Sequence, residues 1–169
     1  MKVERAVRTS MILVLLAINI GCDQVSKSIV RRRIAYDERI RLVDDHMTLT
    51  RIENAGSFLG LGDSLTYPMR FIILTLFPLL FLAVGVAALF VKTNLTGITV
   101  LGLSFVLGGG IGNIFDRIVR GSVTDFIHID FGLFQTGVFN LADVSIMTGI
   151  FILFIHSYIR QAKEIRIKQ

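Results

Sequence analysis

Two long stretches without a charged residue limit what this chain can fold into. They run from Thr93 to Phe115 and from Phe71 to Val91, and they contain 23 and 21 residues. At about 1.5 Å of rise per residue, either stretch forms a helix that can cross the hydrocarbon core of a bilayer, about 30 Å thick. The composition agrees, because 53% of the residues are hydrophobic and only 18% are charged. The sequence therefore predicts a membrane protein.

Two further apolar stretches are too short to cross the membrane by themselves. Thr9 to Cys22 holds 14 uncharged residues, and Val144 to Ile159 holds 16. To span the core, the first must extend to Asp23, and the last must begin near Asn140 and include Asp143. Each helix then carries a carboxylate at or inside a membrane boundary. An ionisable group at that depth is costly, so these acids are functional candidates.

These stretches predict an all-α membrane protein with four transmembrane helices, at about residues 9–28, 71–91, 95–116 and 140–159. We expect residues 1–169 to form a single membrane domain. Four spans place both termini on one side, where 8 basic residues lie in about 25, against 10 in about 65 on the other side. By density the termini are cytoplasmic, whereas the raw count is ambiguous and the triplet Arg31-Arg32-Arg33 on the outer side does not follow the rule.

The two outer segments, about residues 29–70 and 117–139, contain less regular patterns. His46 to Glu53 is rich in threonine and branched residues, which predicts a strand. Asn54 to Ser64 is rich in glycine, which predicts a loop. The apolar stretch Phe126 to Phe134 suits a segment that lies at the membrane interface.

Polar residues of three spans gather near the same, outer leaflet. They are Asp23, Lys27, Asn113, Asp116, Arg117, Asn140 and Asp143, and Asp125 follows just beyond the third span. Spacings of three or four residues place the members of each group on one helix face. In a bundle of four helices, these groups can meet in one pocket near the outer surface.

Each group also has a plainer interpretation. Asn140 with Asp143 could be an N-cap and its capping-box partner. Asp116 with Arg117 could be a boundary ion pair, Asp23 with Lys27 a pair on a helix surface, and Asp125 a solvated loop acid. The glycines of residues 108–112 could serve only close helix packing. The convergence of all groups on one leaflet favours a functional site.

Cysteine, histidine and charge exclude other classes of function. One cysteine permits no intramolecular disulfide, and the three histidines are far apart, so the sequence predicts no metal site. The net charge is +5, but the basic residues flank apolar segments and do not alternate with aromatic residues. Membrane lipids are therefore the expected partner of the tails, and nucleic acid is not.

Five motifs carry a more specific signal. They are "DQVSK" (Asp23 to Lys27), "NAGSF" (Asn54 to Phe58), "GGGIGNIFDR" (Gly108 to Arg117), "GSVTDF" (Gly121 to Phe126) and "FNLAD" (Phe139 to Asp143). In this order they resemble the signature of the lipoprotein signal peptidase family, also called signal peptidase II. The resemblance covers the whole chain.

This resemblance implies an aspartic endopeptidase of the bacterial cytoplasmic (inner) membrane, with its active site near the outer, periplasmic face. Such an enzyme removes the signal peptide from diacylglyceryl-modified prolipoproteins by cleaving on the N-terminal side of the lipid-modified cysteine. The implied catalytic residues are Asp125 and Asp143, with no cofactor and no obligate protein partner. The implied supporting residues are Asp23, Lys27, Asn54, Gly56, Asn113, Asp116, Arg117 and Asn140. Of these, we expect Asn54, Gly56, Asn113, Arg117 and Asn140 to hold the substrate backbone or the reacting oxygens by hydrogen bonds. We expect Asp23 and Lys27 to bind and orient at the edge of the site, and Asp116 to orient Arg117. The family also implies a small extracytoplasmic β-containing cradle and an interfacial lid.

Two other classes of function stay open at this point. Intramembrane acids also suit a small transporter or a proton relay, and a glycine-rich helix suits a non-catalytic assembly factor. Cys22 raises a further question, because a basic start, an apolar run and Gly21-Cys22 outline the signal peptide of a lipoprotein. Asn19 occupies the position three residues before the cysteine, where such signals carry an apolar residue. We therefore expect Cys22 to be an uncleaved helix residue.

Overall fold

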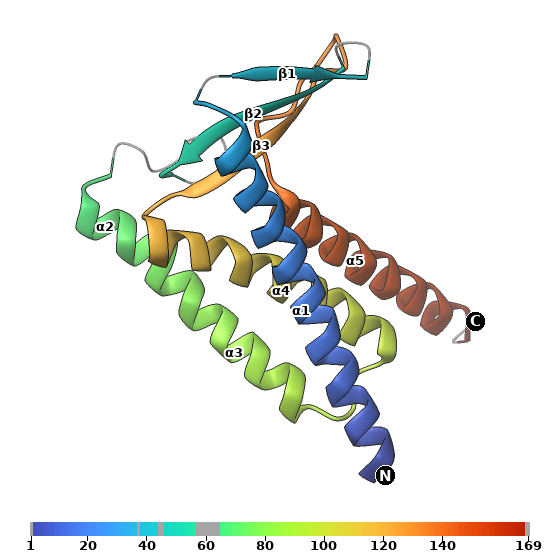
Figure 1. Cartoon of the computed structure of the whole chain (residues 1–169). Coiled ribbons are helices and arrows are strands. Elements are labelled where there is room, and N and C mark those ends of the chain that lie inside the picture. Colours follow the sequence, from blue (N-terminus) through green and yellow to red (C-terminus); the bar gives the residue numbers. More distant parts are fainter. Residues whose placement is uncertain (1, 37, 44–45, 57–64, 168–169) are drawn as a thin grey trace.

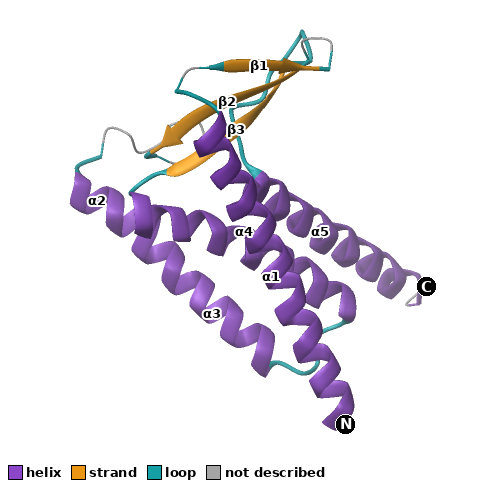
Figure 2. Cartoon of the chain, in the orientation of Figure 1, coloured by secondary structure: helices purple, strands orange, loops and turns teal. Residues whose placement is uncertain are grey.

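The computed structural model describes residues 2–36, 38–43, 46–56 and 65–167, as a helical bundle with a small sheet at one end (Figures 1 and 2). The elements are, in order, α1 (Lys2–Arg33), β1 (Arg39–Leu42), β2 (Met47–Asn54), α2 (Tyr67–Phe71), a π-helical segment (Ile72–Leu76), α3 (Phe77–Val91), α4 (Gly97–Arg120), β3 (Val123–Ile129) and α5 (Leu141–Ile167). The sheet lies at the opposite end of the bundle from the two termini (Figure 1).

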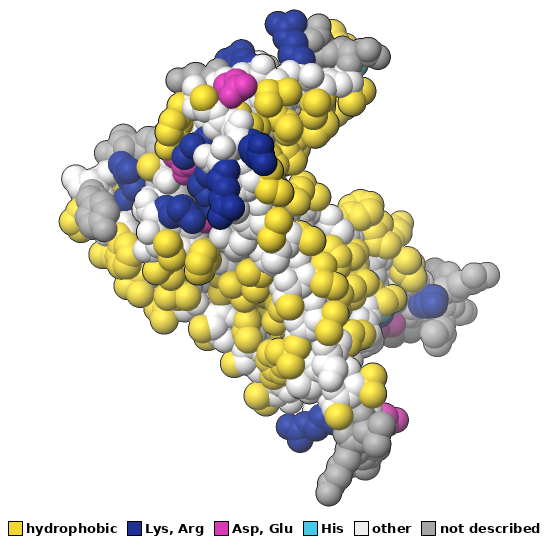
Figure 3. Space-filling model, viewed as in Figure 1, with side chains coloured by type: hydrophobic (Ala, Val, Ile, Leu, Met, Phe, Trp, Pro, Cys, Tyr) yellow, Lys and Arg dark blue, Asp and Glu magenta, His cyan; other side chains and the backbone are white. Residues whose placement is uncertain are grey.

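Four helical stretches are long and apolar enough to cross a membrane, as predicted. They are Glu4–Arg33, Pro68–Val91, Gly97–Arg120 and Leu141–Ile165. They extend beyond the expected ranges, most of all at both ends of the first and at the C-terminal end of the last. A helix satisfies its own backbone groups, so it continues past the hydrocarbon core where polar and charged side chains are allowed. Hydrophobic side chains cover the visible flank of these helices (Figure 3).

The second span changes its helix type just before Pro78. Proline has no N–H group and cannot donate to the carbonyl four residues earlier. The N–H of Phe77 donates to the carbonyl of Ile72, five residues earlier, and the segment Ile72–Leu76 is π-helical. This wider turn joins α2 to α3 without breaking the span.

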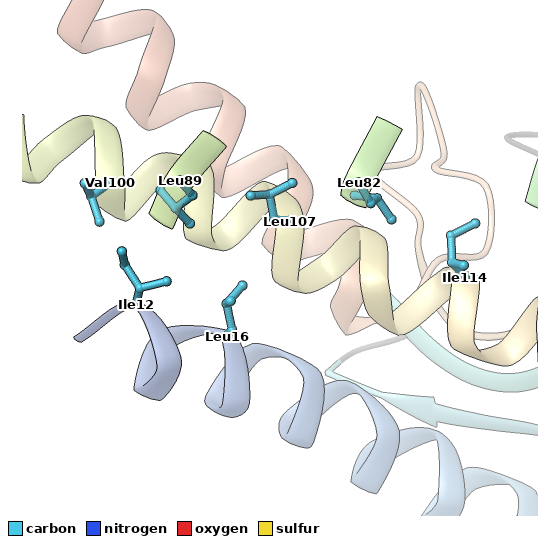
Figure 4. Close-up of a cluster of buried hydrophobic side chains, with 7 residues drawn as sticks. All are labelled: Ile12, Leu16, Leu82, Leu89, Val100, Leu107 and Ile114. Carbon is cyan, nitrogen blue, oxygen red and sulfur yellow. The ribbon is translucent and has the colours of Figure 1, made fainter. Parts of the chain in front are cut away.

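Helix α4 is the centre of the bundle. In the most apolar 18-residue stretch of α4, half is buried inside the protein, against 17% in the corresponding stretch of each of the other three spans. A cluster of side chains from three helices meets along it (Figure 4): Ile12 and Leu16 of α1, Leu82 and Leu89 of α3, and Val100, Leu107 and Ile114 of α4. Lipid tails are as apolar as these side chains, so close packing holds the helices together.

Gly109 shows why the glycine-rich stretch lies on this helix. A Cβ atom at Gly109 would overlap the backbone carbonyl of Ala142 on α5. Only glycine allows the two helix backbones to approach this closely. The packing interpretation of residues 108–112 is therefore correct, and the same close approach brings the start of α5 against α4.

The sheet has the order β1-β2-β3, and both neighbouring pairs are antiparallel. The strand predicted at His46 to Glu53 is confirmed as β2, whereas β1 and β3 were missed. Val30 of α1 and Ile34, directly after it, pack on Phe126 and Ile127 of β3, whose first five residues are all buried. A strand buried on both faces lacks the alternating pattern that reveals a strand in sequence.

The remaining outer segments differ from expectation or lie outside the described residues. Of the stretch expected at the interface, Phe126 to Ile129 belongs to β3 instead, and only the residues after it are outside the strand. Of the loop predicted at Asn54 to Ser64, residues 57–64 lie outside the part that the structure describes. Helix α1 continues unbroken through Cys22, which is therefore a helix residue as predicted, and that it stays uncleaved remains a prediction.

Candidate active site

Asp125 lies inside β3, where its side chain is almost fully buried at 4% exposure. Two amide groups hold its carboxylate. Asn54, at the end of β2, donates from Nδ2 to Oδ2 at 2.9 Å. Asn140, just before α5, donates from Nδ2 to Oδ1 at 2.6 Å. The carboxylate therefore has a fixed orientation, and the solvated loop acid of the plainer interpretation is wrong.

Asp143 lies in the first turn of α5 and is half-buried. Asn113 of α4 donates from Nδ2 to its Oδ1 at 2.8 Å. The backbone N–H of Asn140 donates to its Oδ2 at 3.1 Å, and Asn140 Oδ1 accepts from the backbone N–H of Asp143 at 3.1 Å. This reciprocal pair is a capping box. The plainer interpretation is thus correct, and it also fixes the carboxylate.

Asn140 joins the two acids. Its side chain is fully buried; Nδ2 serves Asp125, while Oδ1 and the backbone N–H serve Asp143. The same Nδ2 lies 3.2 Å from Asn113 Oδ1. One asparagine therefore couples the positions of two carboxylates that come from different elements. Each of the four carboxylate oxygens of the two acids accepts one hydrogen bond from an asparagine. Because such an oxygen has two lone pairs, each can accept a second hydrogen bond.

The pKa of Asp125 is raised to about 6. Burial is the main cause, because it disfavours the charged form. Repulsion from the Asp143 carboxylate raises the pKa further, whereas the hydrogen bonds from Asn54 and Asn140 and the charge of Lys27 lower it. An acid with this pKa exchanges a proton close to neutral pH, as general acid–base chemistry requires.

Lys27 is a fully buried cation at the centre of the polar network. Its Nζ lies 2.8 Å from Asp23 Oδ2, 2.9 Å from Asp116 Oδ2 and 2.9 Å from Asn113 Oδ1. An ammonium group has three donors, so three acceptors satisfy it completely. Lys27 was expected at the edge of the site. Because α1 crosses α4 here, the lysine instead holds Asn113, which in turn holds Asp143.

Asp23 links α1 to the start of α5. Its Oδ1 accepts from the backbone N–H of Ala142 at 3.0 Å, one of the free donors in the first turn of α5. A Cβ atom at Gly112 would lie 2.6 Å from Asp23 Oδ2, so glycine makes room for this carboxylate. The pair with Lys27 is correct, but it is buried between helices and does not lie on a helix surface.

Asp116 does not orient Arg117, which corrects the prediction. Its fully buried carboxylate faces Lys27 at 2.9 Å, Arg31 at 3.5 Å and Arg120 at 3.6 Å. Consecutive residues of a helix point about 100° apart, so Asp116 and Arg117 face different neighbours. Arg117 Nη2 donates instead to the carbonyl of Gly56 at 2.9 Å. It thereby fixes the chain that follows β2 and Asn54.

The structure therefore brings together all ten predicted residues, and it changes what several of them contact. Asn54, Asn113 and Asn140 were expected to hold the substrate backbone or the reacting oxygens, but here they hold the two acids. Sequence reasoning missed a second set that ties the sheet to α1: Arg31 donates to Thr124, and Thr124 and Ser122 donate to Glu53. The sequence offered one sign of this set, because Thr124 stands directly before Asp125 in the motif "GSVTDF".

Comparison with known proteins identifies the family of this chain. A family model described as signal peptidase (SPase) II matches residues 15–159. The lipoprotein signal peptidase of Geobacillus thermodenitrificans is 33% identical over 139 residues, which are 82% of this chain and 84% of that protein. The lipoprotein signal peptidase of Halothermothrix orenii is 32% identical over 146 residues, which are 86% of this chain and 94% of that protein.

Solved structures of bacterial membrane enzymes share the fold. One superposes with a TM-score of 0.77 at 23% sequence identity and covers 91% of both chains. Another has a TM-score of 0.73 at 24% identity and covers 87% of this chain and 92% of the other. The arrangement of four helices and a small sheet is thus one that experimental structures contain.

Proposed function

Because the chain belongs to the signal peptidase II family of membrane proteases, we propose that it hydrolyses prolipoproteins with Asp125 and Asp143 as a catalytic pair. The substrate is a diacylglyceryl-modified precursor, and the bond that breaks lies on the N-terminal side of the lipid-modified cysteine. The observation that carries the proposal is the bridge made by Asn140, which holds both carboxylates within one buried hydrogen-bond network.

The pair supplies an acid and a base from the same type of side chain. Two neighbouring carboxylates in a water-poor site do not both ionise easily, so they share one proton. Burial and repulsion raise the pKa of Asp125 to about 6, so we assign the shared proton to Asp125. Asp143, at the positive N-terminal end of α5, is then the ionised base. Because the two acids interact, their titration is a property of the pair as a whole.

Hydrolysis then proceeds by direct attack of water. Asp143 takes a proton from the water, whose oxygen bonds to the scissile carbonyl carbon, while Asp125 gives its proton to the carbonyl oxygen. The resulting tetrahedral diol collapses when one hydroxyl proton returns to Asp125 and the proton on Asp143 passes to the leaving nitrogen. The C–N bond breaks, and the pair regains its starting protonation. Asn54, Asn113 and Asn140 keep both acids in position throughout.

The placement of the site in the membrane supports this reaction. Both acids lie at the end of the bundle that carries the sheet, and the two termini lie at the other end (Figure 1). With the termini in the cytoplasm, as the density of basic residues favours, the acids lie at the outer boundary of the cytoplasmic membrane. There they meet a precursor whose lipid-modified cysteine is held at that boundary by its acyl chains. In this proposal the three-stranded sheet is the extracytoplasmic cradle, and the outer segments also supply the interfacial lid.

Substitution of each acid by its amide tests the proposal. Asp125→Asn and Asp143→Asn, each in the purified protein reconstituted into lipid, are expected to slow cleavage of a diacylglyceryl-modified precursor by about 10²–10⁴-fold, so that it is abolished on the timescale of parent turnover. The precursor mass measures cleavage, and circular dichroism shows that the helices are intact. Near-normal turnover in either variant would contradict the pair. Asn94→Asp, in the exposed turn between α3 and α4, is a control that changes charge far from the site.

The same experiment separates a protease from the transporter alternative. A transporter or proton relay moves ions along a gradient and leaves the mass of the precursor unchanged. Ion flux in the reconstituted parent protein, together with an uncleaved precursor, would replace the proposed reaction with transport.

A further inference from the structure

A recess lies at the end of the bundle opposite the acids. It is a groove of about 550 Å³ between the start of α4 and the second half of α5, and apolar side chains line most of it. Its apolar wall includes Ile98 of α4 and Phe151 and Ile155 of α5. The volume is that of an ordinary small-molecule site. Nothing in the proposed reaction uses this groove.

One end of the groove is polar and basic. His156, Arg160 and Lys163 line it, at spacings of three and four residues that place them on one face of α5. Arg160 lies 17 residues after Asp143, or about 25 Å along the helix axis. The acids lie at one membrane boundary, so these basic groups lie near the other, at the depth of lipid headgroups.

The two walls of the groove are tied together. His156 Nε2 lies 3.1 Å from the Oγ1 of Thr96, which caps the N-terminus of α4. Helix α5 continues beyond His156 to Ile167, and its last turns lie at the edge of the molecule (Figure 1). The groove is therefore a formed feature of the helix pair, and it opens toward the space that lipid occupies around a membrane-spanning bundle.

From this arrangement we propose that the groove binds an anionic glycerophospholipid of the leaflet that contains the termini. One acyl chain lies along Ile98, Phe151 and Ile155, and the phosphate lies between Arg160 and Lys163. Basic pockets between transmembrane helices are suited to anionic headgroups, and long basic side chains extend from apolar surface to the headgroup level. The ligand thus matches the groove in both polarity and charge.

Charge also decides against two other occupants. The signal segment of a precursor begins with basic residues, which Arg160 and Lys163 would repel. A second copy of the chain would bring the same basic face of α5 to the groove. Among the described residues that line the groove, Glu164 is the acidic one, and its Oε1 is occupied by Arg160 Nε at 3.1 Å.

The chain contains no tryptophan, so a single introduced tryptophan reports on its own surroundings. Phe151→Trp places the reporter in the groove, about halfway along the membrane-spanning part of α5. Phe81→Trp, on the exposed flank of α3 and outside this groove, is the matched reference at a similar depth. Both variants are reconstituted into bilayers that contain phosphatidylglycerol or phosphatidylcholine with brominated acyl chains, which quench a neighbouring tryptophan.

The expected result is a preference for the anionic lipid at the groove alone. Quenching of the Phe151→Trp variant should give an association constant about fivefold larger for phosphatidylglycerol than for phosphatidylcholine, the effect of one unpaired basic group. The reference should show equal quenching by the two lipids. Adding Arg160→Gln and Lys163→Gln should remove the preference, and adding Glu164→Gln should increase it because Arg160 loses its partner.

Three results would overturn the proposal. The first is equal quenching by both lipids at the groove, and the second is an unchanged preference after Arg160→Gln and Lys163→Gln. The third is weaker quenching at the groove than at the reference by both lipids, which would show that another occupant, such as a second copy of the chain, excludes lipid. The measurement does not use precursor cleavage, so the groove and the catalytic pair are tested separately.

Discussion

Removal of the Asn54 side chain should shift the pH dependence of cleavage in a direction that the structure fixes. The pKa of Asp125 is raised to about 6 by burial and by Asp143, and the hydrogen bond from Asn54 to Oδ2 opposes this rise. If Asp125 holds the catalytic proton, activity is lost as the pH rises and that proton leaves. The parent protein should therefore show an alkaline limb in kcat/KM centred at about pH 6.

The size of the shift follows from the strength of one hydrogen bond. A hydrogen bond to a charged group contributes roughly 1.5–3 kcal/mol, and 1.36 kcal/mol corresponds to one pH unit. Asn54→Ala removes a bond that favours the ionised form, so the alkaline limb should move upward by about one to two pH units. Asn94→Ala, in an exposed turn far from the site, should leave the limb where it is.

The assay is cleavage of a diacylglyceryl-modified precursor at substrate concentrations below KM, over a series of buffers of constant ionic strength. Only the position of the limb matters, because the loss of Asn54 can also lower the maximum rate. A limb that stays fixed or moves to lower pH in Asn54→Ala would refute the assignment of the proton to Asp125. A parent profile without any decline above about pH 6 would refute it as well.

Three further variants test how the network is held together. The pKa of Asp125 is 3.8 in the unfolded chain and is raised to about 6 in the folded protein, so the stability that Asp125 contributes is present below pH 3.8 and is lost as the pH rises through about 6. The uncharged side chain of Asp125→Asn avoids this loss. Between about pH 4 and about pH 8, the variant should therefore gain about 3 kcal/mol of unfolding free energy relative to the parent, as measured by denaturation in detergent. Lys27→Met leaves the buried carboxylate of Asp23 without its cation, while Asp116 keeps the more distant Arg31 and Arg120, and it should cost about 3–5 kcal/mol. Lys92→Met, at an exposed position, should stay within about 0.5 kcal/mol of the parent in the same assay, and equal effects of the two variants would contradict the buried role of Lys27. Gly112→Ala places a methyl group 2.6 Å from Asp23 Oδ2 and should slow precursor cleavage without loss of helix content in circular dichroism; parent-like turnover would show that this contact can relax.

Much of the site was predictable because membrane burial leaves few roles for polar groups. Asp23 and Asp143 stood out because the apolar stretches beside them are too short to span without them. The helical spacing of Asp23 and Lys27 predicted a contact that the structure shows at 2.8 Å. Local rules of this kind need only the periodicity of one helix.

The partners across elements could not be predicted in the same way. Lys27 meets Asp116 and Asn113 because α1 crosses α4 at the glycine-rich stretch, and no local pattern gives that crossing. Asp125 looked like a loop residue because β3 is buried on both faces and lacks alternation. The π-helical segment before Pro78 could not be predicted either. Proline removes one hydrogen bond of the helix, and a helix can respond with a kink, a break or a wider turn.

The most direct measurement is the turnover of a lipid-modified precursor by Asp125→Asn, by Asp143→Asn and by the protein that carries both substitutions. If the two carboxylates act on one water as a unit, each single change should lower kcat by about 10²–10⁴-fold. The double variant should then be no slower than the slower single variant, because residues that act as a unit are not additive. Losses that multiply in the double variant, or a single variant with nearly normal turnover, would show that the two acids do not work as a pair.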